Sequence, residues 1–292
     1  MTRHFCTYFD VNYLSRGLAL YRSLSAHCPR ALLWVLCLDE ETHAALNRLR
    51  LPGLKPISFE EFEQGDVELI AAKGNRTRIE YYFTCTPSLP LYVFRQCPQA
   101  DLVTYLDADL FFFSDPEPLF AEMGAGSIAI IAHRFPETLR HLEKFGIYNV
   151  GWVSFKRDEA GLGCLRQWRA KCIEWCGDRY ENGRFADQKY LDDWPSDYPG
   201  VVVLSHHGAN VAPWNLDACH LQLEDDRVLV NDQPLVFFHF HGFKFSPQSG
   251  YDFNLKAYGA RVTPLLGQRV FFPYVRMLAD TSRTVAGLGV QG

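Results

Sequence analysis

The sequence predicts an α/β protein, a single domain with a mostly parallel central sheet flanked by helices. Short apolar segments that read as strands alternate along the chain with segments of helical periodicity. The segment 32–38 is a continuous apolar run, which is typical of a parallel strand buried on both faces. The length of 292 residues and the hydrophobic fraction of 48% suffice for one large core.

The expected elements follow in chain order. Strands are predicted at 4–9, 32–38, 102–106, 127–132, 148–155, 201–204 and 235–240. Helices are predicted at 14–26, 39–50, 79–94, 159–176 and 184–191. Pro87 and Pro90 should kink or divide the third helix, since proline lacks the backbone N–H. Residues 281–292 are small and polar and should form a loose tail after a domain at 1–280.

Composition and charge exclude several classes of protein. The net charge of -5 argues against a broad surface for DNA or RNA, so no nucleic-acid partner is expected. No apolar run approaches the roughly 20 residues that span a bilayer, and no apolar signal segment follows Met1. We therefore expect a cytoplasmic protein with at most peripheral contact to the inner face of a membrane. The nine scattered cysteines predict buried, reduced thiols; a zinc site at Cys172, Cys176 and 206–207 is the alternative.

The most informative segment is the acidic pair after the strand at 102–106. Residues i and i+2 of an extended chain point to the same face, so Asp107 and Asp109 should present their carboxylates side by side. The pair follows the carboxyl end of a buried strand, where open α/β sheets bind ligands. Two adjacent negative charges favour a cation between them, and carboxylates suit Mg²⁺ or Mn²⁺.

A second polar group of residues ends the strand at 235–240. His239 and His241 alternate on one face, and an imidazole added to two carboxylates shifts the preference towards Mn²⁺. Gly242 permits close backbone approach to a ligand. Lys244 offers a point charge for phosphate.

Three further polar positions stand out in apolar surroundings. Asp187 and Gln188 open the helix predicted at 184–191, where a carboxylate also suits the helix macrodipole. Asn149 and Gly151 lie within a predicted strand, where a glycine indicates a bulge or a close approach. Lys73, Arg76 and Arg78 form a basic cluster that is either a solvated face or a contact for diphosphate or donor sugar.

Taken in order, these segments resemble the retaining glycosyltransferases of the GT-A (Rossmann-like) fold, in particular family eight, the glycogenin and bacterial lipopolysaccharide galactosyltransferase group. The matching segments cover residues 5 to 244. They are Thr7, Asp10, Asn12 and Tyr13; Leu106-Asp107-Ala108-Asp109; Asn149 and Gly151; Asp187-Gln188; Trp214-Asn215; and His239, Gly242 and Lys244.

The resemblance implies a metal-dependent, retaining transfer of a sugar from a UDP-sugar to an acceptor that is a glycan, a lipid-linked molecule or a protein. About 1–120 would form the nucleotide-binding half and about 121–250 the half for donor sugar and acceptor. Asp107, Asp109 and His239 would bind Mn²⁺, with Mg²⁺ as the alternative, and Asp187 and Gln188 would act in catalysis. The donor would be bound by Thr7, Asp10, Tyr13, Arg78, Asp107, Ala108, Asn149 and Lys244.

Two departures from the family pattern leave alternatives open. Lys244 follows Gly242 by two residues instead of three, and Phe245 replaces a proline, so either His239 or His241 is the metal ligand. The basic residue that precedes the acidic pair in the family is absent, so Arg78 or Lys73 takes its place or the contact is missing. Two other functions also fit the acidic pair: a haloacid-dehalogenase-like phosphatase using Asp107 and Asp109, and a nucleotide-sugar binder without catalysis.

Overall fold

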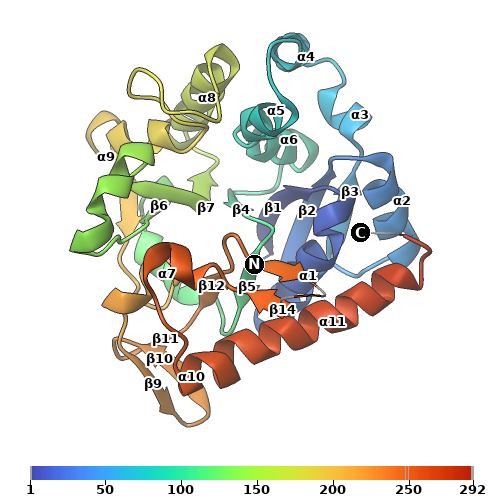
Figure 1. Cartoon of the computed structure of the whole chain (residues 1–292). Helices are drawn as coiled ribbons and strands as arrows, with labels where there is room; N and C mark the ends of the chain where they lie inside the picture. The colour runs from blue at the N-terminus through green and yellow to red at the C-terminus, as the bar shows by residue number, and fades with distance from the viewer. Residues whose placement is uncertain (1, 247, 249, 291–292) are drawn as a thin grey trace.

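A seven-stranded sheet forms the centre of the structure, a computed structural model that describes residues 2–246, 248 and 250–290 (Figure 1). Its strand order is β3-β2-β1-β4-β7-β6-β8. Adjacent strands are parallel except at β7, which is antiparallel to both neighbours. The strands are β1 Arg3–Phe9, β2 Ala31–Cys37, β3 Leu54–Ile57, β4 Leu102–Leu106, β6 Ile128–Ala132, β7 Tyr148–Lys156 and β8 Val201–Leu204. The predicted α/β domain with a mostly parallel sheet is therefore confirmed.

Helices cover both faces of this sheet. One face packs against α1 Leu14–His27, α2 Glu40–Leu49, α7 Glu117–Met123 and α11 Phe272–Ala286. The other packs against α3 Phe59–Glu63, α4 Val67–Lys73, α5 Arg78–Cys85, α6 Ser88–Gln96, α8 Glu159–Glu174 and α9 Trp194–Asp197. Alternation along β1 explains the two layers, because Phe5 faces the first layer and Cys6 the second, both fully buried.

The predicted helix at 79–94 is divided, as its prolines suggested. α5 ends at Cys85 and α6 begins at Ser88, with Pro87 between them. Pro90 is tolerated in the first turn of α6, where a backbone N–H has no partner within the helix. The residues between the two helices include the fully buried Thr86, which bears on the site described below.

The predicted helix at 184–191 is wrong. Glu181 and Arg184 pair across a tight turn through Asn182 and Gly183, both at positive φ. Ala186 also has a positive φ of 45°, and its N–H bonds to Gly177, so no α-helical turn starts here. Only a short 3₁₀ segment, η3 Lys189–Asp193, follows.

Smaller elements lie outside the seven-stranded sheet. β5 Leu110–Phe112 pairs with β12 Phe237–His239, which is shorter than the strand predicted at 235–240. The other small strands are β9 Leu221–Glu224, β10 Arg227–Val230, β11 Gln233–Pro234, β13 Lys244–Ser246 and β14 Gly250–Asp252. The remaining helical turns are η1 Val11–Tyr13, η2 Glu137–Phe145, η4 Leu216–Ala218, η5 Leu255–Tyr258, α10 Pro264–Leu266 and η6 Gly267–Phe271.

The end of the chain is more ordered than its composition suggested. The expected loose tail from residue 281 instead continues α11 to Ala286, while residues 291–292 lie outside the described part of the chain. The Thr281 hydroxyl is fully buried and bonds to the Ser15 carbonyl of α1. α11 therefore packs along α1 (Figure 1). None of the helices in the described residues combines the length and apolar character needed to cross a bilayer.

Candidate functional site

The acidic pair lies in the turn between β4 and β5. The Asp107 N–H bonds to the Gly151 carbonyl on β7 at 3.2 Å. The Asp109 carbonyl accepts the Phe240 N–H, just after β12, at 2.9 Å. These bonds fix the turn to two strands that are distant in sequence. The side chains are 31% exposed for Asp107 and 14% for Asp109, so a small ion from solvent can reach both.

The antiparallel pairing of β5 with β12 brings His239 to this turn. His239 lies opposite Leu110 in the register, and its ring is buried. Its Nε2 is 3.0 Å from Asp109 Oδ1 and 3.6 Å from Asp107 Oδ2. Its Nδ1 is buried and has no hydrogen-bond partner among the described residues. The structure therefore brings together the three residues that the sequence suggested as metal ligands.

His241 belongs to the same cluster. Single ligand atoms of Asp109, His239 and His241 lie within 4.8 Å of one another. In the part of the chain that the structure describes, no lysine or arginine pairs with Asp107 or Asp109. Carboxylates and imidazoles without a neighbouring protein cation form the mixed oxygen and nitrogen set that Mn²⁺ prefers. The donor set thus fits a divalent cation, and both histidines are within its reach.

The charges of the cluster are strongly coupled. Burial raises the pKa of Asp107, repulsion from Asp109 adds to this rise, and His239 opposes it. Burial acts to raise the pKa of Asp109 as well, but the charge and hydrogen bond of His239 outweigh it and lower that pKa. Burial acts to lower the pKa of His239, and Asp109 outweighs it in the other direction. A divalent cation would favour the ionised form of both carboxylates.

Trp214 packs against the histidines of the cluster. Its ring centroid is 5.1 Å from that of His239 and 5.4 Å from that of His241, both edge to face. The indole N–H donates to the His133 carbonyl at 2.9 Å, and the side chain is 3% exposed. The single indole therefore limits the orientations available to both rings, a role that Trp214 did not have in the sequence analysis.

Gly151 allows β7 to approach His239. A β-carbon at this position would lie 3.0 Å from His239 Nδ1 and Cε1 and 2.5 Å from Asn149 Oδ1. Asn149 Oδ1 accepts the Gly151 N–H at 3.0 Å, and its amide nitrogen lies 3.3 Å from Nε2 of the buried His133. Burial lowers the pKa of His133 to about 3, so this ring is neutral. The close approach expected of Gly151 is made by a protein side chain.

Asp187 lies in the loop between α8 and η3, near enough to the cluster for the charge of Asp107 to act on it. It is 6% exposed, and the indole N–H of Trp168 donates to its main-chain carbonyl at 2.8 Å. Burial raises the pKa of its carboxyl to about 7, with a hydrogen bond from Thr86 opposing and the charge of Asp107 adding to the shift. The Thr86 hydroxyl lies 3.2 Å from the Tyr8 hydroxyl. Asp187 is thus an ionisable group within a hydroxyl network that links it to β1.

One cavity of about 660 Å³ connects these groups. Its polar lining includes Asp107, Asn149, Asp187, Gln188, His239 and His241. Gln188 is held there by its amide, which donates to the Phe145 carbonyl at 3.0 Å. Phe145 and Phe185, with ring centroids 4.9 Å apart, form an aromatic wall of the cavity. The cavity therefore offers acid, amide and aromatic surfaces to one ligand.

The remaining predicted residues are not among those that line the cavity. Asp10 caps η1, and Arg78 Nη2 lies 3.4 Å from Asp10 Oδ2, so these two residues meet. Tyr13 is 41% exposed, and the Arg16 guanidinium lies over its ring. Burial is the main cause of the raised pKa of Tyr13, and the negative charge of Asp109 adds to it. Ala108 is buried within the acidic turn.

Thr7, Lys244 and Lys73 likewise do not line the cavity. Thr7 is fully buried and points toward the α1 layer, because alternation along β1 sends Tyr8 to the cavity instead. Lys244 is exposed on the β13–β14 hairpin and does not line the cavity. Lys73 is paired with Glu63, so Arg78 is the cation of that cluster that reaches Asp10, directly after β1.

Comparisons with known proteins agree with this architecture. No protein-family model matches the chain. The chain is 32% identical over 277 residues to the uncharacterised protein YfnD of Bacillus subtilis (strain 168), covering 94% of this chain and 88% of YfnD. It is 33% identical over 253 residues to YfnF of the same organism, covering 84% of this chain and 82% of YfnF.

Among solved structures, the galactosyltransferase LgtC in complex with donor and acceptor sugar analogues covers 95% of both chains with a TM-score of 0.54 and 16% identity. The glycosyltransferase GlyE of Streptococcus pneumoniae TIGR4 covers 99% of this chain and 64% of its own, with a TM-score of 0.55 and 16% identity. At this level of identity the similarity concerns the fold, which is that of the GT-A glycosyltransferases.

Proposed function

Since the chain belongs to the family of YfnD and YfnF and has the GT-A fold, we propose that it is a glycosyltransferase that moves a sugar from a nucleotide-diphosphate donor to an acceptor hydroxyl. The observation that carries the proposal is the cluster of Asp107, Asp109 and His239 at the mouth of a cavity that also contains Asp187 and Gln188. The donor is a UDP-sugar, the metal is Mn²⁺, and the transfer proceeds with retention.

The residues of the cavity divide the work between the two ends of the donor. Asp107, Asp109 and His239 would hold Mn²⁺, which when bound supplies a Lewis acid for the departing diphosphate. Asp10 and Arg78 pair just after β1, and together with Tyr13 they would contact the nucleoside. Asn149, Asp187 and Gln188 support a position for the donor sugar between the metal cluster and the aromatic wall.

In the transfer, the bond between the anomeric carbon and the diphosphate oxygen breaks, and the acceptor oxygen bonds to that carbon from the same face. The acceptor proton passes to the departing diphosphate. The Asp187 carboxylate stabilises the positive charge that develops on the sugar ring, and the Gln188 amide orients the sugar. The acceptor is a glycan, a lipid-linked molecule or a protein.

The phosphatase alternative is less well supported by the cavity. A haloacid-dehalogenase-like enzyme needs a lysine beside its nucleophilic aspartate. Among the described residues that line the cavity there is no lysine, and the groups nearest Asp107 are His239, Asp109 and Tyr105. The geometry therefore favours a metal-bound diphosphate over a phosphorylated Asp107.

The experiment is a thermal-shift titration with UDP, GDP, CDP and ADP, each in Mn²⁺ and in EDTA. A ligand that binds only the folded protein adds about 2.7 kcal/mol of stability at a hundred times its Kd. We expect a rise with UDP in Mn²⁺ that EDTA removes, and its loss in the Asp107→Asn, Asp109→Asn double variant. Asp101→Asn, an exposed carboxylate beside the other end of β4, is the matched control.

Binding and turnover are then separated with UDP-sugars. Release of UDP from a UDP-sugar supports the transferase, whereas binding without release favours a nucleotide-sugar binder. Equal UDP binding in Mn²⁺ and EDTA, or unchanged binding in the double variant, would exclude the proposed metal site.

A further inference from the structure

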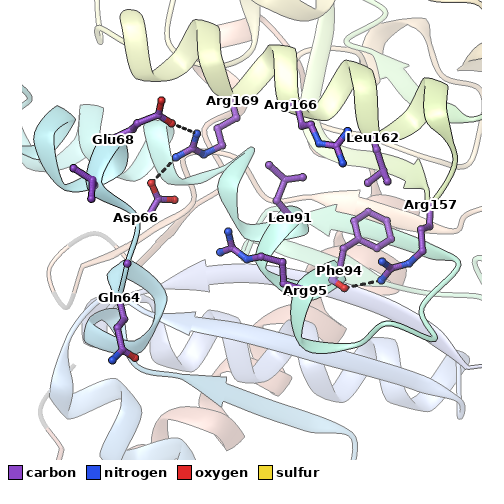
Figure 2. Close-up of a pocket in the computed structure, with 12 residues that line it drawn as sticks. Gln64, Asp66, Glu68, Leu91, Phe94, Arg95, Arg157, Leu162, Arg166 and Arg169 are labelled. Carbon is purple, nitrogen blue, oxygen red and sulfur yellow. Dashed lines mark hydrogen bonds and ion pairs between the residues drawn. The ribbon is translucent and has the colours of Figure 1, made fainter.

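A second cavity, of about 640 Å³, lies between α4, α6 and α8 (Figure 2). Arg95 lies in the last turn of α6, shortly before β4, and Arg157 directly follows β7. Leu102 pairs with Lys156 at this end of the two strands, whereas Asp107 follows β4 at the other. At about 3.3 Å per residue, the five residues of β4 separate the two cavities by roughly 16 Å. The second cavity is therefore independent of the acidic cluster.

Four arginines line this cavity, and two of them have partners within the protein. The Arg157 guanidinium donates to the carbonyls of Phe94, Cys97 and Ala100 at 2.6 to 2.8 Å. Arg169 pairs with the carboxylates of Asp66 and Glu68. These bonds fix the walls of the cavity, because they tie β7 to the end of α6 and α8 to the start of α4.

The other two arginines, Arg95 and Arg166, have no acidic partner among the residues that the structure describes. Figure 2 shows their exposed side chains on either side of Leu91, one from α6 and one from α8. Four guanidinium groups thus face two carboxylates, both already engaged by Arg169. The excess of positive charge is local, since the whole chain has a net charge of -5.

We propose that this cavity binds a phosphomonoester through Arg95 and Arg166. A planar guanidinium matches a phosphate with two parallel hydrogen bonds, and two of them balance the charge of a phosphate dianion. Leu91 and Leu162 give the cavity an apolar surface for the carbon part of the ligand. The ligand is therefore a phosphate group joined to an organic group, either in a free metabolite or in the headgroup of an anionic lipid.

The test measures binding of glycerol 3-phosphate by isothermal titration calorimetry in EDTA, so that no divalent cation bridges the ligand to the acidic cluster. The variants are Arg95→Gln, Arg166→Gln and the double variant. Arg30→Gln, an exposed arginine in the turn between α1 and β2, is the control. We expect the double variant to lose at least about tenfold in affinity and the control to bind as the wild type does. Wild-type affinity should fall as salt concentration rises.

The source of the phosphate is distinguished with vesicles of phosphatidylcholine, with and without phosphatidic acid. Binding only to vesicles that contain phosphatidic acid, lost in the double variant, assigns the site to a lipid headgroup. Binding of glycerol 3-phosphate without vesicle binding assigns it to a free phosphomonoester. Absence of both, or binding that the double variant retains, would overturn the proposal. UDP binding in Mn²⁺ is measured on the same variants and should remain unchanged.

Discussion

Replacing Gly151 with alanine tests how the sheet holds His239. The added methyl group would lie 2.5 Å from Asn149 Oδ1, closer than packed atoms tolerate, and 3.0 Å from two atoms of the His239 ring, a tight contact. Asn149 must rotate and lose its bond to the Gly151 N–H, which contributes about 1 kcal/mol. The buried His239 ring must also shift, and overpacking of this kind costs about 1–3 kcal/mol. We therefore expect Gly151→Ala to lower the free energy of unfolding by about 2–4 kcal/mol.

The same displacement should weaken metal binding, because the His239 ring moves relative to Asp109, to which its Nε2 is bonded at 3.0 Å. The assay combines urea denaturation with a Mn²⁺ titration of the folded variant. Gly163→Ala in α8 is the control, since its β-carbon would meet no atom within 4 Å. The control should gain about 0.5–1 kcal/mol from helix propensity. If Gly151→Ala matched the wild type in both stability and Mn²⁺ affinity, the packing argument would be refuted.

Three further predictions concern the surroundings of the cavity. Trp214→Phe removes the hydrogen bond to the His133 carbonyl and part of the packing on His239 and His241. The affinity for Mn²⁺, measured by competition with a chelator, should therefore fall while the circular dichroism spectrum stays unchanged. An affinity equal to that of the wild type would contradict this. Burial raises the pKa of Asp187 to about 7, so turnover should rise with pH up to that value. Because the folded state holds this proton more tightly than the unfolded state, the free energy of unfolding should fall as the pH rises from about 4 to 7. Asp187→Asn should remove this fall in the free energy of unfolding. The Glu80 carboxylate accepts hydrogen bonds from the N–H groups of Thr77 and Asp178, and the bond from Thr77 is the main cause of its lowered pKa. The ionised carboxylate therefore stabilises the fold above about pH 4, and this stabilisation is lost as the pH falls through the lowered pKa. Glu80→Gln should lower the free energy of unfolding by about 1–3 kcal/mol at pH 7 and by less in acid, as measured by denaturation at both pH values.

The central strands and the acidic pair could be predicted because their signals are local. The apolar run at β2 and the position of Asp107 after β4 depend only on neighbouring residues. The approach of His239 could be suspected from residue type, but its geometry depends on the pairing of two three-residue strands, β5 and β12, more than a hundred residues apart. Strands that short carry too few residues for a pairing to be recognised from periodicity.

The errors have equally specific causes. Whether Thr7 or Tyr8 points to the cavity depends on the direction in which the side chains of β1 alternate. Because β1 is buried on both faces, its apolar sequence does not reveal this direction. The helix expected at 184–191 was prevented by the turn at Ala186, whose N–H is used by Gly177 across a loop. Trp214 was matched by motif alone, because an indole that packs on two histidines is defined by tertiary contacts.

The packing of α11 on α1 has a consequence for how the protein is synthesised. The Ser15 carbonyl accepts the Thr281 hydroxyl, Arg22 donates to Thr284, and Val285 completes the core beneath α1. Because α11 is synthesised long after α1, the outer side of α1 stays uncovered until α11 has left the ribosome. A nascent chain stalled before Phe272 would expose that apolar surface to chaperones, and a product that lacks α11 would aggregate.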